Sequence, residues 1–415
     1  PCTMLVRAVV GRKRAGDPPE HIFALDTRQR IVAATEIYIS GRSHIHTAIA
    51  SDSKVSAMFV LVVFALLLAS AQLALGFGRP SLRSLRKASL PLRSSVGTSS
   101  TANKSNPLAE FDYSTEDKLP WMESGYSTWE FQGKKVNYVD VGYEEGKNKP
   151  KILLIHGFGA SVYHWRYNIP ALARDFQVFA IDMLGFGLSE KPIQDYTAEL
   201  WRDQTLAFIE EVVQRRDDRP TAVCGNSLGG FTALYAAADD KAKKLINGCI
   251  LVNAAGRFKA SFVEPKEEAG WITSLKGAFQ RFVIGLSFVY TKQPLRIQQV
   301  LRQVYPVNAD IVDDELVESI RFPAQDPNAA EVFYRVIKKN GNGPPVFVDD
   351  LLQTVKVPLL LLWGERDPWI RPAAADKIQA LFPAAKRVNV DGGHCPHDEA
   401  SGACNAAIRD FLLGA

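Results

Sequence analysis

The stretch that decides the fold is Gly-Asn-Ser-Leu-Gly-Gly at residues 225–230, between the β-rich run Thr221–Cys224 and the helical stretch Phe231–Ala238. Small residues two positions before and after Ser227 allow a sharp turn from strand to helix. Such a turn exposes the serine oxygen above the C-terminal edge of a sheet, where the following helix favours developing negative charge. The pattern predicts that Ser227 is a nucleophile.

Two later loops supply partners for this serine. Gly-Glu-Arg-Asp-Pro-Trp at 364–369 follows the apolar run Val357–Trp363, and Asp-Gly-Gly-His-Cys-Pro-His at 391–397 follows Arg387–Val390. The chain order serine, acid, histidine is the order that a turn of this kind requires. We expect His394 to take the proton of Ser227 and Asp367 to fix the imidazole tautomer.

Three nearby groups are alternatives for these roles. Glu365 is the alternative acid, His397 the alternative base, and Asp391 a candidate for either orienting role. Glu365 and Asp391 are interpreted as solvated loop charges, and His397 lies three residues past the Gly-Gly pair that gives His394 its reach. Some proteins with this turn place the acid one strand earlier, but that run ends in Asn253, which favours the later acid.

The oxyanion hole of such a site uses the N–H after the nucleophile and one from the loop after the third strand. These positions are Leu228 and Phe158, the latter in His-Gly-Phe-Gly at 156–159. His156 is interpreted as a residue that shapes this turn. Cys224 and Cys395, which flank the nucleophile and the base in sequence, are interpreted as small buried core residues.

Short β-rich runs alternate with helical stretches from about residue 126 onward, which predicts an α/β fold with a mainly parallel sheet. The first two runs alternate like an antiparallel hairpin, and the others are short and apolar. The predicted strands not yet named are Trp129–Gln132, Val136–Val141, Lys151–Ile155, Phe176–Ile181 and Cys249–Asn253.

A long helical insertion separates Cys249–Asn253 from Val357–Trp363, and its size predicts a cap domain at about residues 257–350. Apolar residues recur there at three- and four-residue steps, which is typical of one face of a helix. We interpret this stripe as packing onto the core; the alternative is that part of it roofs an apolar substrate pocket. The stripe consists of Trp271, Leu275, Phe279, Phe282 and Leu286.

Composition excludes several classes of function. The chain has 415 residues, 47% of them hydrophobic, and a formal net charge of only +4, so nucleic acid is not an expected partner. Its five cysteines are an odd number without Cys-x-x-Cys spacing, which indicates neither a disulfide framework nor a zinc site. We expect neither a metal nor a cofactor.

Targeting sequence is predicted at residues 58–110. Residues 1–57 lack an initiating methionine and are expected to be an over-extended gene model or disordered. Residues 58–76 are apolar and end in Ala-Leu-Gly, which predicts a signal peptide, or alternatively a membrane anchor. Residues 77–110 are basic and Ser-rich, as in a transit peptide. Together these segments resemble the bipartite presequence that directs proteins to complex plastids, with the secretory pathway or a membrane anchor as the alternative.

From about residue 120 to 415 the sequence resembles the α/β-hydrolases, and within them the chloroplast hydrolases of the pheophytinase and chlorophyll dephytylase group. The motifs that carry the resemblance are His-Gly-Phe-Gly-Ala-Ser at 156–161, Asp-Met-Leu-Gly-Phe-Gly-Leu-Ser at 182–189, the serine turn, Trp-Gly-Glu-Arg-Asp-Pro-Trp at 363–369 and Gly-His-Cys-Pro-His-Asp-Glu at 393–399. The resemblance implies an eight-stranded, mostly parallel sheet with helices on both faces and a helical cap after strand 6.

The same resemblance implies a serine hydrolase that cleaves a hydrophobic carboxylic ester, such as a phytyl or lipid ester, through an acyl-enzyme, with membrane association for substrate access. Gly-Asn-Ser-Leu at 225–228 departs from the Cys-Asn-Ser-Ile of pheophytinases, which leaves the substrate open. The alternatives are a carbon–carbon bond hydrolase of the ring-cleavage type, a cofactor-free haloperoxidase and a non-catalytic ligand receptor.

Overall fold

The computed structural model describes residues 108, 111–262, 270–338 and 345–414, and the side chains of 270–279 are not among those described. The chain divides into units 1–88 and 89–415, and all the described residues belong to the second. The predictions for 1–57 and 58–76, and nearly all of that for 77–110, therefore lie outside the described residues. No helix among those described has the length and apolar character needed to cross a bilayer.

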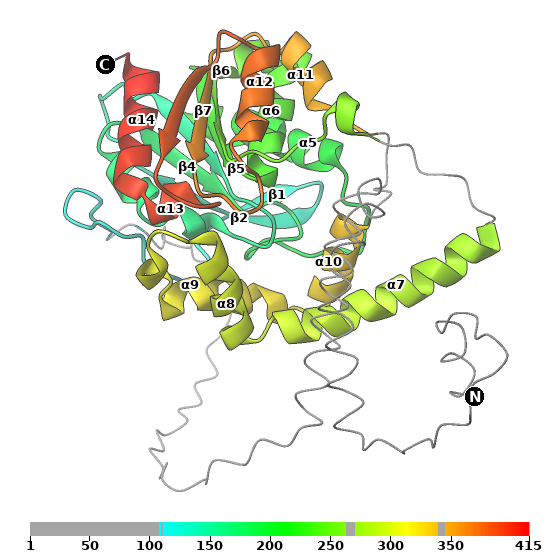
Figure 1. Ribbon diagram of the computed structural model, residues 1–415. Helices are drawn as coiled ribbons and strands as arrows, with labels where there is room; N and C mark the ends of the chain where they lie inside the picture. The colour runs from blue at the N-terminus through cyan, green and yellow to red at the C-terminus, as the bar shows by residue number, and fades with distance from the viewer. Residues whose placement is uncertain (1–107, 109–110, 263–269, 339–344, 415) are drawn as a thin grey trace, which may run out of the picture. The chain divides into compact units, whose positions relative to one another are not determined.

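An eight-stranded sheet in the order β1-β2-β4-β3-β5-β6-β7-β8 forms the centre of the second unit (Figure 1). β1 pairs with β2 and β2 with β4 in antiparallel fashion, and all later pairs are parallel, as the sequence predicts. The strands are β1 Ser127–Phe131, β2 Lys134–Val141, β3 Lys151–Ile155, β4 Gln177–Ile181, β5 Thr221–Asn226, β6 Ile246–Val252, β7 Leu359–Gly364 and β8 Lys386–Val390.

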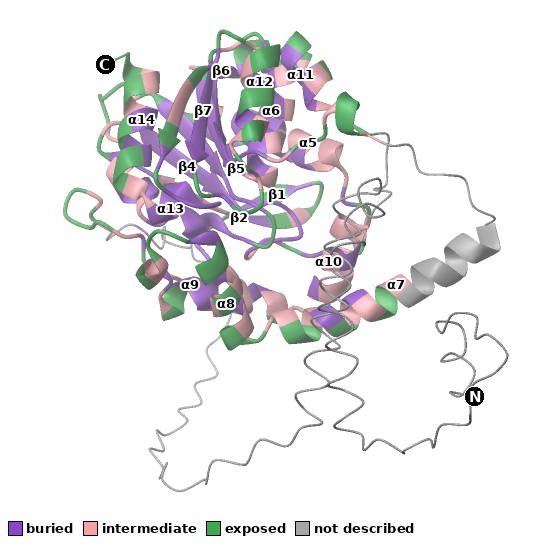
Figure 2. Ribbon diagram, in the orientation of Figure 1, coloured by how far each residue is buried: buried purple, intermediate pink, exposed green. Residues whose placement is uncertain are grey.

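Helices cover both faces of this sheet, because its central strands are apolar on both sides. In β3, Leu153 and Ile155 enter the core on one face, and Ile152 and Leu154 enter the core on the other. Figure 2 shows the strands as the most continuously buried part of the fold. The first face carries α5 Ala198–Glu211, α6 Leu228–Ala238, α11 Val348–Thr354 and α12 Ala373–Leu381, and the second carries α4 Asn168–Ala173 and α14 Ser401–Leu413.

The turn around Ser227 is tighter than the sequence prediction placed it. Strand β5 continues to Asn226, and α6 begins at Leu228 rather than at Phe231, so Ser227 alone separates strand from helix. Its φ angle of 54° is responsible, since this left-handed conformation reverses the chain within one residue. Gly229 and Gly230 then form the first turn of the helix rather than a loop.

The cap lies between β6 and β7 and consists of helices near the C-terminal edge of the parallel strands (Figure 1). It is made of α7 Gly270–Thr291, α8 Pro294–Val304, α9 Asp314–Arg321 and α10 Ala329–Ile337, while the four-residue α13 Pro396–Glu399 follows the last strand.

One prediction about the cap is wrong. Phe282 and Leu286 lie on α7 as predicted, but their side chains are 69% and 54% exposed, so they do not pack onto the core. Ile284 is the buried residue of that turn, which places the covered face of α7 on another side of the helix. The other three residues of the predicted stripe have side chains outside the described set.

Candidate active site

The Ser227 turn is held by close backbone packing. A Cβ on Gly225 would lie 2.1 Å from the carbonyl oxygen of Gly229, so a glycine is required there. The Ser227 N–H donates to the Val252 carbonyl at 3.0 Å, and the Ser227 carbonyl accepts from Ala255 N at 2.9 Å. These bonds hold Ser227 in a backbone conformation that a residue with a Cβ rarely adopts, and conformations of this kind cluster at active sites.

His394 and Asp367 come together although they lie on different loops, after β8 and β7. The Nδ1 of His394 is 2.7 Å from the Oδ2 of Asp367, and both residues are 4% exposed. The other carboxylate oxygen of Asp367 accepts from the N–H groups of Trp369 at 2.7 Å and Ile370 at 3.0 Å. The carboxylate is therefore fixed in orientation, and it favours the imidazole tautomer with the proton on Nδ1.

Asn253 also contacts this acid, a role that the sequence prediction missed. Its Nδ2 donates to Asp367 Oδ2 at 2.7 Å, and its Oδ1 accepts from Gly364 N at 2.9 Å. The residue is fully buried and has a positive φ of 42°. From the sequence we could tell only that the strand before Asn253 ends without a carboxylate. The signal for its role was its position: Asn253 follows β6, which lies next to β7, and the loop after β7 carries Asp367.

Asn226 joins the serine turn to the loop after β8 that carries His394, which we call the histidine loop. Its Nδ2 donates to the His394 carbonyl at 2.9 Å and to the Val252 carbonyl at 3.2 Å. Because Asn226 directly precedes Ser227, this buried amide holds the backbone of the predicted base beside the turn that carries the predicted nucleophile. The structure thus brings the loops of all three predicted catalytic residues to one edge of the sheet.

The two predicted oxyanion residues lie beside the same turn. Leu228 is the first residue of α6, so its N–H has no acceptor within the helix. Phe158 follows β3 on a loop that approaches Ser227, since a Cβ on Gly157 would be 3.2 Å from that of Ser227. The Phe158 ring is 37% exposed and packs against Phe186, with ring centres 5.4 Å apart.

His156 shapes this loop, as the sequence suggested. Its Nε2 accepts from Met183 N at 3.0 Å, so its Nδ1 carries the proton that is donated to the Gly157 carbonyl at 2.7 Å. Complete burial lowers the pKa of His156 and keeps the ring neutral.

The alternative acids lie in water and the alternative base in the core. Glu365 and Asp391 are exposed, and Asp391 pairs with Arg366 at 2.7 Å. His397 is fully buried and stacks on Trp165 with ring centres 4.1 Å apart. Burial lowers its pKa well below the ordinary value of 6.5.

The two flanking cysteines are buried, as expected. Burial raises the pKa of both thiols, Cys224 on β5 and Cys395 after His394, which makes them poor nucleophiles.

The acidic end of the histidine loop binds the cap. Arg166 is fully buried and bonds both oxygens of Asp398, at 3.0 Å and 3.3 Å, while Tyr305 of the cap donates to Asp398 at 2.9 Å. The same guanidinium reaches Asp313 at 2.6 Å and the Ile311 carbonyl at 2.7 Å. This buried network ties the cap residues to the loop that carries His394.

Glu399 extends this connection to the predicted base, His394. One carboxylate oxygen accepts from Val307 N at 2.7 Å and Asn308 N at 2.9 Å in the cap. The other accepts from Gly393 N, next to His394, and His394 N donates to the Val304 carbonyl at 3.0 Å. Residues 304–313 of the cap, which we call the clamped segment, therefore hold the backbone at His394 directly through Val304 and at Gly393 indirectly through Glu399.

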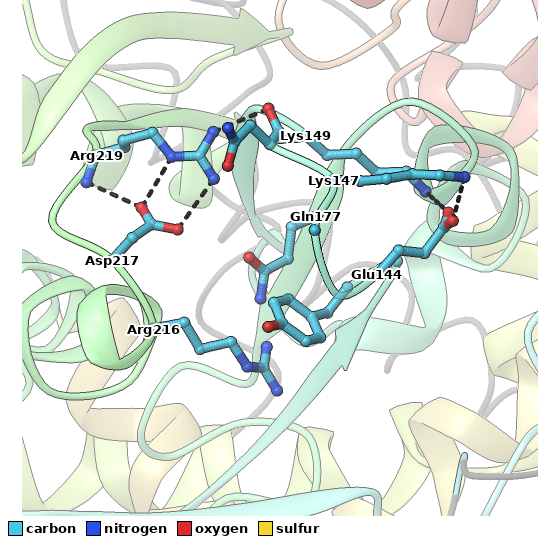
Figure 3. A pocket seen from close by; sticks show the side chains of 11 residues that line it. Glu144, Lys147, Lys149, Gln177, Arg216, Asp217 and Arg219 are labelled. Carbon is cyan, nitrogen blue, oxygen red and sulfur yellow. Dashed lines mark hydrogen bonds and ion pairs between the residues drawn. The ribbon is translucent and has the colours of Figure 1, made fainter.

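Cavities among the described residues include one at each end of the sheet. One of about 350 Å³ borders Leu228 and Phe231 of α6, Thr197 and Glu199 near the start of α5, and Val336 of the cap. The other, of about 160 Å³, lies at the N-terminal ends of the strands beside Gln177 (Figure 3).

Each charged residue that lines the smaller cavity has an ion-pair partner, which for Arg216 is Asp140 outside the lining. Asp217 binds Arg219 at 3.0 Å, and Glu144 binds Lys147 and Lys149, so nothing there is arranged for chemistry (Figure 3). The described residues also contain no group of three His, Cys, Asp or Glu side chains that could hold a metal ion.

Comparison with known proteins assigns the chain to a family. Residues 150–401 match the family model of the alpha/beta hydrolase fold. The chain belongs to this family. It is 30% identical to chloroplastic pheophytinase of Arabidopsis thaliana over 67% of this chain, and it spans 64% of the length of that relative.

Other members of the family have different chemistry in their names. The 2-hydroxy-6-oxo-6-(2'-aminophenyl)hexa-2,4-dienoic acid hydrolase of Metapseudomonas resinovorans is 38% identical over 62% of this chain and 81% of its own. A crystal structure of a meta-cleavage product hydrolase superposes with a TM-score of 0.54 at 22% identity, covering 70% of this chain and 98% of that one. That likeness shows the shared fold.

Proposed function

We propose that this α/β hydrolase cleaves a hydrophobic carboxylic ester, with Ser227 as nucleophile, His394 as base and Asp367 as the acid that orients the imidazole. The observation that carries the proposal is the buried 2.7 Å contact between His394 Nδ1 and Asp367 Oδ2, on a loop that Asn226 holds beside Ser227. With its Nδ1 occupied in this way, the imidazole has Nε2 left to accept a proton.

The reaction proceeds in two halves. Ser227 Oγ attacks the ester carbonyl while His394 takes its proton, and the carbonyl oxygen becomes an oxyanion that the N–H groups of Phe158 and Leu228 stabilise. Collapse of this intermediate breaks the bond to the alkoxy group, which leaves as an alcohol with the proton from His394. Water then attacks the acyl-enzyme by the same route and releases the carboxylic acid.

Apolar groups around this site support a hydrophobic substrate. Trp369 is 58% exposed and packs against His394 with ring centres 4.9 Å apart, and Phe158 is exposed on the oxyanion side. The relative named pheophytinase adds weight to a long-chain ester such as a phytyl or lipid ester. A small molecule of this kind is the partner that we propose.

Carbon–carbon hydrolysis is the second candidate, and the 38% identity to the dienoic acid hydrolase favours it. Both reactions need a base and an oxyanion hole, so the contacts described above are common to them. They differ in the leaving group, which is an alkoxide in one and a carbanion in the other.

A direct comparison separates the two candidates. The full chain is given a phytyl or other long-chain ester and, separately, a vinylogous diketone of the ring-cleavage type, with Ser227→Ala as the matched control. We expect faster turnover of the ester and loss of that turnover in Ser227→Ala. Preferential turnover of the diketone would replace the ester proposal by the second candidate, and ester turnover that survives in Ser227→Ala would reject Ser227.

We also propose that residues 58–76 act as a cleaved signal peptide and 77–110 as a plastid transit peptide, ahead of a hydrolase domain at 120–415 with its cap at about 257–350. The support is the apolar run followed by a basic, Ser-rich segment. Residues 58–110 fused to a fluorescent protein are expected to direct it to the plastid. Retention in the secretory pathway would contradict the transit function.

A further inference from the structure

The outer side of the cap exposes a group of large apolar residues. Phe282, Leu286 and Val289 follow one another at four- and three-residue steps on α7 and are 69%, 54% and 53% exposed. Tyr290, 42% exposed, and Leu295 at the start of α8, 75% exposed, extend the group. We call these five residues the α7–α8 face. Such a concentration of exposed apolar side chains marks a binding surface rather than ordinary scatter.

The charged residues of the sequence stretch that carries this face are all basic. Residues 269–309 contain Lys276, Arg281, Lys292, Arg296 and Arg302 and no acidic residue. Arg281 pairs with Glu331 of α10 at 3.1 Å, whereas Lys292, Arg296 and Arg302 form no ion pair with any described carboxylate. An exposed apolar stripe bordered by unpaired cations is the arrangement that binds at the surface of an anionic membrane.

A line of aromatic rings runs from α7 to the candidate active site. Phe288 of α7 packs against Phe333 of α10, and Phe333 packs against Phe158 of the oxyanion loop, with ring centres 5.3 Å apart in both pairs. An apolar molecule that leaves a lipid layer at α7 would thus meet apolar side chains on its way to Phe158.

We propose that the α7–α8 face docks on an anionic lipid bilayer and that the ester enters the site from there. The docking rests on exposure and charge, and only the entry of substrate rests on the proposed ester hydrolysis. A second copy of the chain is the poorer occupant, because a two-fold contact of this face with itself brings its cations together. Nucleic acid does not match the apolar stripe.

The test uses the full chain with a polarity-sensitive fluorophore on Leu286→Cys and, as the matched control, on Leu381→Cys of α12. Leu381 is 48% exposed and lies on the helix layer of the sheet, away from the cap. The four described native cysteines are buried, and the unsubstituted chain, treated in the same way, gives the background. Vesicles of phosphatidylcholine with or without phosphatidylglycerol are then added.

We expect a blue shift at position 286 with phosphatidylglycerol vesicles and none at position 381. This comparison is independent of any membrane affinity of residues 58–76, which are present in both proteins. An equal shift at both positions, or none at 286, would overturn the docking. A shift at 286 that grows with protein concentration in the absence of vesicles would assign the face to a second copy instead.

Two further variants separate docking from chemistry. Arg302→Gln is expected to weaken vesicle binding through this face about fivefold, the effect of one cation near an anionic surface. Phe282→Ser with Leu295→Ser should leave turnover of a short water-soluble ester unchanged and lower turnover of an ester embedded in vesicles. Equal turnover of the embedded ester would overturn the entry route, whereas a wild-type chain without any esterase activity would reject the proposed function and leave the docking standing.

Discussion

The two ends of the cap are held to the molecule in opposite ways. The clamped segment, residues 304–313, is joined to the histidine loop through buried Arg166, Asp398 and Glu399. The α7–α8 face instead presents apolar side chains to solvent, and its nearest ion pair, Arg281–Glu331, is partly exposed. One end of the cap is therefore tied to the loop that carries His394, and the other is exposed to solvent.

Charge divides the cap in the same way. Residues 269–309 carry only basic charges, whereas residues 310–331 contain Arg321 as their one cation among the acids Asp310, Asp313, Asp314, Glu315, Glu318, Asp326 and Glu331. Acids of the second stretch are used internally, since Asp313 and Glu315 bind Lys118 at 2.8 Å and 2.6 Å. The difference indicates that one inserted domain can hold the loop of His394 with one end and leave the other end exposed to solvent.

Breaking the buried network that holds the clamped segment should have the largest effect on stability. Arg166→Met leaves Asp398 buried without its charge partner, and we expect the free energy of unfolding to fall by about 3–5 kcal/mol. The matched change near the α7–α8 face is Arg281→Met, which removes the ion pair with Glu331. Because the arginine side chain is 55% exposed, we expect the free energy of unfolding to fall by about 1 kcal/mol or less. Urea unfolding of both variants makes the comparison, and equal losses would contradict the division of the cap.

A conservative substitution of Glu399, which links the clamped segment to Gly393, should lower turnover. In Glu399→Gln one of the two acceptor oxygens becomes an amide N–H₂, which cannot accept from both the cap and Gly393 N. A lost buried acceptor costs about 1–3 kcal/mol, so we expect kcat to fall about ten- to a hundredfold through displacement of His394, with KM little changed.

Steady-state kinetics on a soluble ester test this, with Glu331→Gln on α10 as the control. If Glu399→Gln changes only KM, or changes neither KM nor kcat, the contacts of Glu399 with the clamped segment do not position His394.

Buried His397, next to Asp398 in the sequence, should also make stability depend on pH. Burial lowers the pKa of His397, so the folded chain keeps this ring neutral while the unfolded chain takes up a proton below the ordinary value of 6.5. The stability associated with His397 is therefore present above about pH 6.5 and is lost as the pH falls, by about 1.4 kcal/mol per pH unit.

His397→Phe keeps a ring against Trp165 and removes this titration. Unfolding free energies measured from pH 7 to 5 should decline less steeply in the variant than in the wild type. Parallel curves would show that His397 takes up a proton as readily in the folded chain as in the unfolded chain. The described part of the cap contains no histidine, so no comparable effect is expected from the α7–α8 face.

The smallest effect is expected at the α7–α8 face itself. Phe282→Ser removes an exposed ring and should change the free energy of unfolding by no more than about 0.5 kcal/mol. Leu301→Ala on the buried side of α8 should cost about 2–5 kcal/mol, because Leu301 is only 6% exposed. Thermal or urea unfolding compares the two, and a large loss in Phe282→Ser would show that this face is covered in the folded chain.

The strands could be predicted because burial on both faces leaves a simple pattern. The apolar run Lys151–Ile155 became β3 with the predicted bounds, and the serine turn lies between a strand and a helix as predicted, although it is shorter than predicted. Helical periodicity, by contrast, tells which residues share a face but not what covers that face. For this reason α7 was predicted as a helix while the packing of Phe282 and Leu286 was not.

Contacts between distant residues could not be read from the sequence. Asn253 lies 114 positions before Asp367, and Arg166 lies 232 positions before Asp398. Each residue is unremarkable in its own segment, and only the parallel sheet brings their loops to one edge. The stretch after His394 was recognised as distinctive, but the reason, its attachment to the cap, required the structure.

The central claim is that Ser227 is a nucleophile activated by His394. The most direct measurement is mass spectrometry of the full chain after reaction with a fluorophosphonate, which forms a stable adduct with an activated serine. We predict one adduct, on the peptide that contains Ser227, absent in Ser227→Ala and strongly reduced in His394→Ala. An adduct that persists in Ser227→Ala, or forms at the wild-type rate in His394→Ala, would contradict the assignment.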